Sequence, residues 1–481
     1  MTSERRAPGK ASWGVFAGIT LLGAVLYMVL AHYGSVWADE AYSLAMIRHS
    51  YGEMLSLTAA DVHPPLYYFL LKLCTAPFGY SMLSVQIFTV LPYCLLLLFG
   101  GIALEKLFSR RAGWLFSGLF LLYPFALQYS CEIRMYTWAA LFVFFCGIYA
   151  VRAVEERGFR NWALLTFFGL CAAYTHYFAL VSVGMIYLLL LVAVCKKKDG
   201  MGKAWILCAV ISVVIYIPWL RAFLGQLAFK VSNDYWIPPI TVPFLLGFIR
   251  HLFGSDVFFP YIIVCAPSFL AAFISLLRSG TQREKYLALG GLFVPVGTIL
   301  VGVIAGLLVR PVFVIHYVMP AVPLMIAFLA VSLGQMRPKA LRRVILGLFL
   351  VGGVINYALT LRSEIVTDGP QLNGDYASAL GGDCCVCDTG EIHTAAVLAY
   401  YVPETPVYAD IYTDVPEANA FDNQHPLEEY VPGKADTVIL LVAKDADPAE
   451  QLAACGEGYS VEYLGSVTAV EVTSDVYRLT K

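Results

Sequence analysis

Long apolar segments alternate with short polar connections from about residue 13 to residue 361 of this 481-residue chain. A helix needs about 20 mainly apolar residues to cross the hydrocarbon core of a bilayer. The sequence therefore predicts eleven membrane-spanning helices, at residues 13–36, 84–105, 112–128, 134–151, 161–174, 177–195, 204–222, 257–277, 287–309, 312–333 and 344–361. Segment 161–174 is short for a span, so the count could differ by one or two. The apolar stretch 241–254 is also too short, and we expect it to lie along the membrane interface.

The composition agrees with this pattern, because 59% of the residues are hydrophobic and only 14% are charged. Soluble domains carry about 25% charged residues, so we predict an integral membrane protein. The net charge of −2 argues against nucleic-acid binding, which calls for a basic surface. The first apolar segment is longer than the core of a signal peptide, about 7–15 residues, so we expect it to stay as a helix.

Basic residues give the orientation. Arg5, Arg6 and Lys10 precede the first span, and further clusters of Lys and Arg occupy the connection after every second span. Because basic residues stay in cytoplasmic loops, we predict a cytoplasmic N-terminus. The first loop, residues 37–83, and the C-terminal region then face outward.

The composition changes near residue 362, and the remainder is polar and mixed. Alternating strand-like and helix-like stretches predict a small α/β domain outside the cell. We expect strands at 384–387, 407–411, 437–443 and, as a hairpin-like pair, 460–479, with helices near 393–401 and 448–455. The fold class is therefore a mainly α polytopic membrane helix bundle with a small C-terminal extracytoplasmic α/β domain.

The C-terminal region holds a group of cysteines, Cys384, Cys385, Cys387 and Cys455. Disulfides can persist outside the cell. Cys384 and Cys385 are adjacent, so at most one cysteine of that cluster is expected to pair with Cys455. The alternative, a cysteine-rich metal site, lacks paired C-x-x-C spacing.

Asp39 and Glu40 follow the first span directly. A charged residue at membrane depth costs about 2.5–3.5 kcal/mol on insertion scales. Acidic residues beside a span are therefore expected to have a structural or catalytic role. They could be solvated residues that end the helix, or one could be a general base that takes a proton from an attacking hydroxyl. Neighbouring helical residues point about 100° apart, so only one of them can aim at a given substrate atom.

Asp61 and His63 lie later in the same outer loop, before Pro64 and Pro65. Prolines favour the start of a helix, and residues 66–74 read as a short amphipathic interfacial helix. Asp61 would fall near its N-cap. Capping explains the acid but not His63, so both residues are candidates for catalysis.

Three further polar clusters lie on the predicted outer side. Their members are Glu132, Arg134 and Tyr136; His176 and Tyr177; and Arg310, His316 and Tyr317. Ion pairing, an interfacial position or contact with lipid headgroups could account for each. Arginine also offers a bidentate fork for phosphate. All the clusters share one side of the membrane, which favours a common binding site there.

These motifs resemble the polyprenyl-phosphate-sugar-dependent glycosyltransferases of the C-type membrane fold, which include protein O-mannosyltransferase and lipid A aminoarabinose transferase relatives. The likeness covers about residues 13–335. It rests on Asp39-Glu40, His63-Pro64-Pro65-Leu66-Tyr67, Glu132-Ile133-Arg134-Met135-Tyr136, Thr175-His176-Tyr177-Phe178 and His316-Tyr317-Val318-Met319-Pro320-Ala321-Val322-Pro323. Bacterial members often carry Arg-Tyr where this chain has His316-Tyr317.

The resemblance implies transfer of a sugar, with inversion, from a polyprenyl phosphate to an extracytoplasmic hydroxyl of a lipid, an envelope glycan or a protein, at the plasma membrane. The family's catalytic aspartate maps onto Asp39. A cation stabilises the leaving phosphate, and Arg134, Arg310 and His316 are the candidates.

No cofactor is certain from the sequence. A divalent metal is an open alternative, because Asp39, Glu40, Asp61 and His63 could supply its ligands. The resemblance implies a transmembrane glycosyltransferase domain at residues 1–362, with a catalytic loop at 37–83. Residues 363–481 form the second domain.

A different class of protein, a secondary transporter or lipid flippase without covalent chemistry, is the alternative. Transporters often show inverted repeats and helices broken near the bilayer midplane. The sequence has no clear repeat, and its polar clusters lie at the outer surface. A plain membrane anchor for the C-terminal domain would leave the loop acids and His63 without a role.

Overall fold

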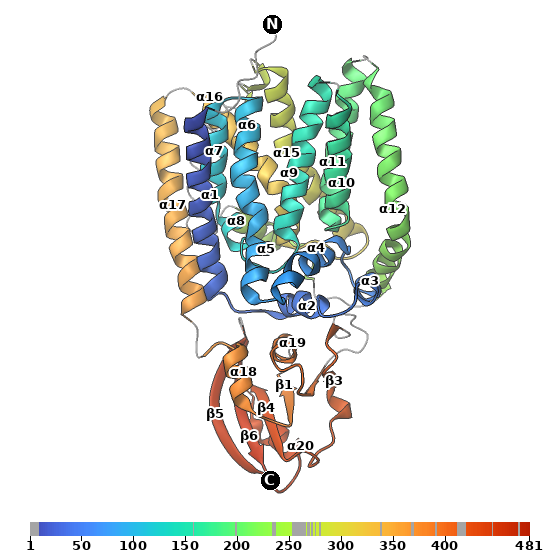
Figure 1. Cartoon of the computed structure of the whole chain (residues 1–481), viewed down its shortest axis with the longest axis vertical. Coiled ribbons are helices and arrows are strands. Elements are labelled where there is room, and N and C mark those ends of the chain that lie inside the picture. The colour runs from blue at the N-terminus through green and yellow to red at the C-terminus, as the bar shows by residue number, and fades with distance from the viewer. Residues whose placement is uncertain are drawn as a thin grey trace. The chain divides into compact units, whose positions relative to one another are not determined.

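The structure is a computed structural model, shown in Figure 1. It describes residues 9–156, 158–197, 200–232, 237–252, 280–336, 339–366, 370–389, 392–410, 420–444, 446–469 and 472–481, with residues 266, 270, 273, 274 and 276–278. The chain divides into two compact units. The membrane unit comprises Met1–His32 and Val62–Thr360, and the C-terminal unit comprises Tyr33–Asp61 and Leu361–Lys481. Residues 37–61, the first half of the predicted outer loop, therefore group with the C-terminal domain.

Eight helices in the described residues are long and apolar enough to cross a membrane, and each coincides with a predicted span. They are α1 (Lys10–Tyr33), α5 (Met82–Leu95) continued through η2 (Leu96–Gly100) and α6 (Gly101–Leu107), α9 (Tyr136–Glu156), α11 (Tyr177–Lys197), α12 (Met201–Ser232), α15 (Gln282–Leu308), η3 (Ile315–Ala321) continued by α16 (Val322–Gln335), and α17 (Lys339–Ile365). The helical bundle is confirmed, whereas the total count of eleven and the orientation stay predictions.

The other three predicted spans have different outcomes. Residues 112–128 do not form one helix, because α7 (Arg110–Leu121) ends before Pro124 and α8 (Pro124–Gln128) begins there. Proline lacks a backbone N–H and is favoured in the first turn of a helix, so Pro124 begins α8 and does not continue α7. Helix α10 (Phe159–Ala173) has 15 residues, as its short apolar segment predicted. Most of the predicted span 257–277 lies outside the described residues.

Helix α9 is central to the membrane unit, because it contacts α5, α10, α11, α15, α16 and η3. Its side chains Ala139, Ala140 and Val143 are fully buried. The Phe144 ring stacks on Phe116 of α7 with centroids 5.0 Å apart. The membrane unit is thus a packed core of helices around α9.

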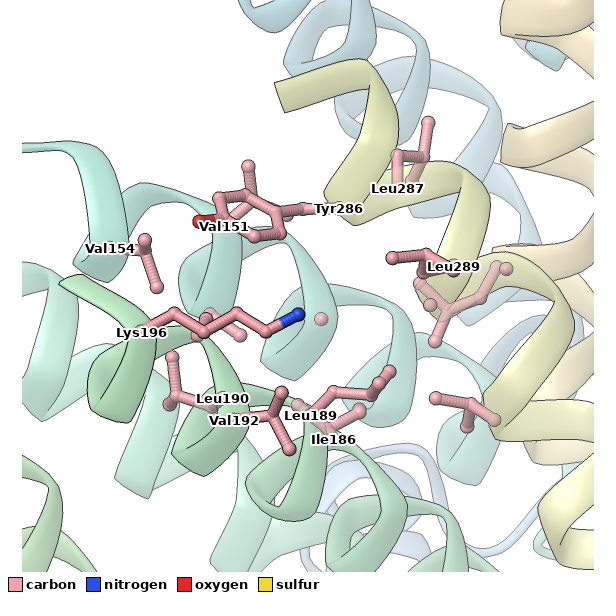
Figure 2. A pocket seen from close by; sticks show the side chains of 17 residues that line it. Val151, Val154, Ile186, Leu189, Leu190, Val192, Lys196, Tyr286, Leu287 and Leu289 are labelled. Atoms are coloured by element: carbon pink, nitrogen blue, oxygen red, sulfur yellow. The ribbon is translucent and has the colours of Figure 1, made fainter. Parts of the chain in front are cut away.

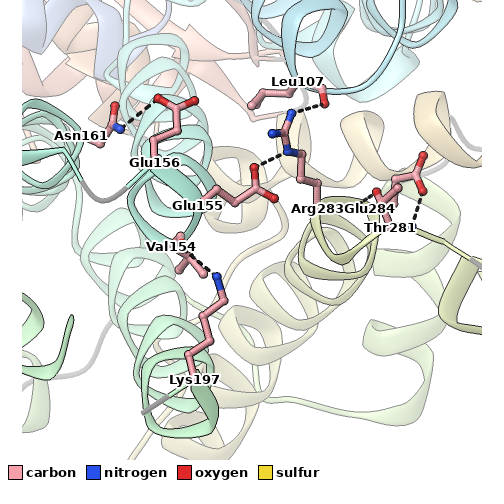
Figure 3. Close-up of polar contacts among 9 residues, drawn as sticks. All are labelled: Leu107, Val154, Glu155, Glu156, Asn161, Lys197, Thr281, Arg283 and Glu284. Carbon is pink, nitrogen blue, oxygen red and sulfur yellow. Dashed lines mark hydrogen bonds and ion pairs between the residues drawn. The ribbon is translucent and has the colours of Figure 1, made fainter. Parts of the chain in front are cut away.

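Polar side chains join the C-terminal ends of α9 and α11 to the start of α15 (Figure 3). Arg283 forms an ion pair with Glu155, and its Nη1 donates a hydrogen bond to the Leu107 carbonyl oxygen at 3.4 Å. Lys197 Nζ donates to the Val154 carbonyl oxygen at 2.7 Å. These contacts fix the helix ends on the side where the predicted cytoplasmic loops begin.

The loop after α1 contains three short helices. Helices α2 (Ala38–Met46) and α3 (Tyr51–Ala60) belong to the C-terminal unit, and α4 (Leu66–Thr75) belongs to the membrane unit. Ser50 and Glu53 form a capping box at the start of α3, in which each side chain accepts from the other residue's backbone N–H. The predicted helix at 66–74 is confirmed, but α2 and α3 were not predicted.

The C-terminal unit contains a six-stranded sheet in the order β3-β2-β1-β4-β6-β5. Strands β1 (Cys384–Asp388), β2 (Val407–Ala409), β3 (Gln424–Pro426) and β4 (Thr437–Ala443) run parallel, and β5 (Ser460–Ala469) and β6 (Val472–Thr480) form an antiparallel pair at one edge. Besides α2 and α3, its described α-helices are α18 (Gly374–Leu380), α19 (Ile392–Tyr401) and α20 (Pro448–Ala454). The predicted α/β domain is confirmed, and β3 is the one strand that was not predicted.

The four cysteines of this unit are buried free thiols. Cys384 and Cys455 belong to one apolar cluster with Val438 and Leu440 of β4. Burial raises the pKa of Cys384 and of Cys455 to about 11, and that of Cys385 to about 12. The cysteines therefore act as small apolar side chains of the sheet core.

Candidate active site

Asp39 and Glu40 lie in the first turn of α2, where the partial positive charge of a helix N-terminus stabilises carboxylates. Glu40 is buried, and its Oε2 accepts a hydrogen bond from the Trp37 backbone N–H at 3.2 Å. Asp39 is partly exposed. Glu40 therefore caps the helix, and Asp39 is the more accessible of the two acids.

Asp61 ends α3 as its C-cap and has only 1% of its surface exposed. The Tyr42 hydroxyl of α2 donates a hydrogen bond to Asp61 Oδ2 at 3.1 Å. The predicted cap at the start of α4 is wrong, because Pro65 occupies that N-cap position without a side-chain cap bond. The backbone of Asp61 holds the C-cap position of α3, but a helix C-terminus carries partial negative charge, so it does not stabilise the Asp61 carboxylate. Its contact is with α2.

Helix α2 packs against α19 inside the C-terminal unit, and eight of its nine residues are buried. Just beyond α2, Arg48 Nη2 donates to the Tyr400 carbonyl oxygen at 3.3 Å, and its guanidinium lies 4.7 Å from the centroid of the Tyr400 ring. His49 Nε2 lies 2.9 Å from the Ala420 carbonyl oxygen. A carbonyl only accepts, so this nitrogen carries the proton. The helix that bears Asp39 is thus held by the C-terminal domain.

The membrane unit gathers a second group of predicted site residues, which we call the histidine–arginine cluster. Its members are His63, Arg134, Tyr136, His176, His316 and Tyr317. Arg134 has 3% of its surface exposed, and its Nη2 lies 3.4 Å from His63 Nε2. A guanidinium has no acceptor, so His63 Nε2 accepts and a neutral His63 ring carries its proton on Nδ1.

His176 links the cluster to the start of α11. Its Nδ1 accepts the Phe178 backbone N–H at 3.2 Å, so the ring carries its proton on Nε2. The His176 ring lies 5.0 Å from Tyr317 and 5.8 Å from Tyr136, measured between centroids. The cluster therefore presents N–H and O–H donors around a permanent cation.

His316 packs between aromatic rings, with its centroid 4.9 Å from Tyr136 and 5.7 Å from Tyr129. Tyr129 in turn places its hydroxyl 3.5 Å from His251 Nε2 on α13 (Val242–Leu252). Burial, followed by the carboxylate of Glu132, raises the pKa of Tyr129. Tyr129 and His251 were not among the predicted site residues. Tyr129 lies three residues before Glu132 of a predicted cluster, whereas His251 lies in the segment 241–254 that we expected along the interface.

The remaining predicted residues occupy other positions. Tyr177 is directed toward α12, where its hydroxyl bonds to Gln226 Oε1 and accepts from Trp219 Nε1 at 3.1 Å. Arg310 lies in the connection after α15 and is partly exposed. Glu132 is partly exposed in the turn before Arg134, and its backbone oxygen accepts the Arg134 N–H at 2.7 Å.

The predicted metal ligands Asp39, Glu40, Asp61 and His63 are not gathered as a ligand set. Among the residues that the structure describes, no three His, Cys, Asp or Glu side chains come together in a way that could hold a metal ion.

No protein-family model matches the sequence, and no curated protein sequence matches it. The solved structures that are similar to it include two of ArnT. ArnT from Cupriavidus metallidurans in the apo state has a TM-score of 0.67 and 13% identity, and the match covers 98% of each chain. The same protein bound to undecaprenyl phosphate has a TM-score of 0.66 and 12% identity, over 96% of this chain and 98% of that chain. The chain therefore has the ArnT fold over almost its whole length.

Proposed function

We propose that this protein is a membrane glycosyltransferase that moves a sugar from a polyprenyl phosphate to a hydroxyl group on the extracytoplasmic side. The shared fold supports this, because a solved structure of that fold binds undecaprenyl phosphate. The observation that carries the proposal in this chain is the buried guanidinium of Arg134 among histidine and tyrosine side chains.

The histidine–arginine cluster has the chemistry of a phosphate site. Arg134 offers a planar fork of N–H donors that matches phosphate oxygens. His176 Nε2–H and the hydroxyls of Tyr136 and Tyr317 are further donors near it. In a buried setting such hydrogen bonds to charge are stronger than in water. We assign Arg134, rather than Arg310 or His316, as the cation that binds the donor phosphate.

Asp39 is the proposed general base. It takes the proton of the acceptor hydroxyl, the oxygen attacks the anomeric carbon, and the bond from that carbon to the phosphate oxygen breaks with inversion. The electron pair leaves on the phosphate, where Arg134 stabilises the charge. Phosphate is a weak base, so no general acid is required, in contrast to a glycosidase with two carboxylates. Glu40 is occupied at the helix cap and does not compete for this role.

We assign the C-terminal domain a positioning role. Arg48 and His49 attach the end of α2 to Tyr400 and Ala420 of that domain. Tyr42 joins α2 to Asp61, which closes α3. Removal of residues 365–481 would take away the surface on which α2 packs, so we expect it to abolish transfer.

Sugar transfer in membranes tests the function. Membranes with the full chain receive sugars linked to polyprenyl phosphate, and transfer to hydroxyl acceptors is compared between the wild type and Asp39→Asn. Asp375→Asn is the matched control, because Asp375 occupies the same second position of a helix in the same unit and is exposed. We expect transfer by the wild type and the control and none by Asp39→Asn.

Two results would contradict the proposal. Undiminished transfer by Asp39→Asn would remove Asp39 as the base and make Asp61 the next candidate. Movement of the lipid-linked sugar between leaflets of proteoliposomes, without transfer from any donor, would replace the enzyme by the flippase alternative.

A further inference from the structure

The membrane unit contains an apolar cavity of about 120 Å³ between α9, α11 and α15 (Figure 2). Its walls include Val151 of α9, Ile186 and Leu190 of α11, and Gly290 of α15. Engineered apolar cavities of about 150 Å³ stay dry and take up apolar molecules. The cavity is therefore large enough to receive part of an apolar ligand.

This cavity is remote from the histidine–arginine cluster. Lys196 at its rim lies 20 positions beyond His176, which is about 30 Å along α11 at 1.5 Å per residue. On α9, Val151 lies 15 positions beyond Tyr136, or about 22 Å by the same rise. The cavity thus belongs to the opposite end of the spans, next to the Glu155–Arg283 ion pair.

Lys196 and Tyr286 are the polar side chains among the lining residues. Figure 2 shows the Lys196 side chain extending toward the middle of the cavity from α11. The neighbouring cations are engaged elsewhere, because Lys197 donates to Val154 and Arg283 pairs with Glu155. No described residue forms an ion pair with Lys196, so the ammonium is available to an anion.

We infer that the cavity binds one anionic phospholipid, with part of an acyl chain inside and the phosphate on Lys196. The three helices that form the cavity are candidate membrane spans, so acyl chains are the apolar molecules that surround it. Basic pockets between spans on the cytoplasmic side recognise anionic headgroups. Tyr286 suits the boundary between the acyl chain and the headgroup of the lipid, because tyrosine is enriched at the membrane–water interface. This inference does not depend on the proposed sugar transfer.

Gly290 supplies a way to close the cavity. A Cβ atom there would lie 3.9 Å from Leu189 Cδ1, which is an ordinary contact, so Gly290→Leu can fill the space without displacing the backbone. The adjacent Gly291 is unsuitable, because its Cβ would approach the Phe328 Cβ to 2.5 Å. Gly290→Leu therefore fills the space for the acyl chain, and Lys196→Gln removes the positive charge that would bind the phosphate.

Native mass spectrometry of the full chain tests the site. The protein is extracted from vesicles of phosphatidylcholine mixed with phosphatidylglycerol, and retained lipid is counted. We expect one phosphatidylglycerol on the wild type and none on Gly290→Leu. Lys196→Gln should bind it roughly fivefold more weakly, the ratio that follows from about 1 kcal/mol per basic residue.

Lys203→Gln is the control, because Lys203 is exposed near the start of α12 and does not line the cavity. It should retain phosphatidylglycerol as the wild type does. Equal retention of phosphatidylcholine and phosphatidylglycerol, or unchanged binding by Lys196→Gln, would overturn the inference. Lys196 is exposed, so its variant should fold even if Gly290→Leu does not.

Discussion

The acidic helix α2 and the histidine–arginine cluster are held by different means. Helix α2 is short, and it is fixed within the C-terminal unit by packing against α19 and by polar contacts from Arg48, His49 and Tyr42. The cluster is part of an aromatic core in the membrane unit, where Arg134 is almost fully buried. The first arrangement leaves Asp39 partly exposed, and the second removes a cation from water.

This difference matches the two roles. A general base must exchange protons with an acceptor and with water, which requires access. A cation for phosphate is more effective away from water, because charge interactions are stronger there. Changes near α2 should therefore lower kcat, whereas changes in the cluster should also weaken donor binding.

The largest expected effect separates the two acids of α2. General bases contribute about 10²–10⁴-fold, so Asp39→Asn should lower kcat roughly a thousandfold with little change in the donor KM. Glu40→Gln keeps an oxygen that can accept the Trp37 N–H, so it should lose only a small part of the rate. Steady-state kinetics on both variants measures this. A larger loss in Glu40→Gln than in Asp39→Asn would exchange their roles.

The next effect distinguishes the two candidate cations. Lysine keeps the charge of Arg134 but loses the bidentate fork, so Arg134→Lys should lower kcat/KM for the donor roughly 10- to 100-fold, since hydrogen bonds to charged groups contribute about 1.5–3 kcal/mol. Arg310→Lys makes the same change at a partly exposed site and should have a small effect. Competition by free polyprenyl phosphate gives the affinity directly. The reverse order of the two variants would assign the phosphate to Arg310.

A moderate effect should come from the support of α2. Arg48→Ala removes the hydrogen bond to Tyr400 and the contact with its ring. We expect kcat to fall about tenfold, below the roughly 10²-fold that a 1 Å misplacement can cost. Arg48→Lys should restore part of the rate. Hydrogen exchange of the full chain should show faster exchange at residues 38–47 in Arg48→Ala. Unchanged exchange together with an unchanged kcat would remove the positioning role.

Much of the fold could be predicted because its signals are local. The spans α11 and α15, for example, each correspond to one continuous apolar run in the sequence. Strand β4 occupies the predicted residues 437–443 because five of its seven residues are fully buried, which produces an apolar run bounded by polar residues. These features need no knowledge of distant parts of the chain.

Long-range packing could not be predicted in the same way. The grouping of Tyr33–Asp61 with the C-terminal unit depends on residues more than 300 positions away. The motif at 175–178 placed His176 and Tyr177 together, but neighbouring residues at a helix start point in different directions. Only His176 joins the cluster, while Tyr177 binds Gln226 of α12. Asp61 was assigned to the helix after it, because the Ser50–Glu53 capping box that marks the start of α3 was not used as a helix signal.

The smallest expected effect on rate concerns that same residue. Tyr42→Phe removes a buried hydrogen bond to the Asp61 carboxylate, and loss of such a partner typically costs about 1–3 kcal/mol of unfolding free energy. If Asp61 only positions α2, the unfolding temperature of the full chain should fall. The pH profile of kcat should then stay as in the wild type. If Asp61 were the base, loss of the donor would make its carboxylate more basic, because the Tyr42 hydroxyl stabilises the charged form. The acidic limb of the pH profile would then move to higher pH. An unchanged acidic limb of the pH profile, together with a lower thermal stability, would assign Asp61 to the positioning of α2 and leave Asp39 as the base.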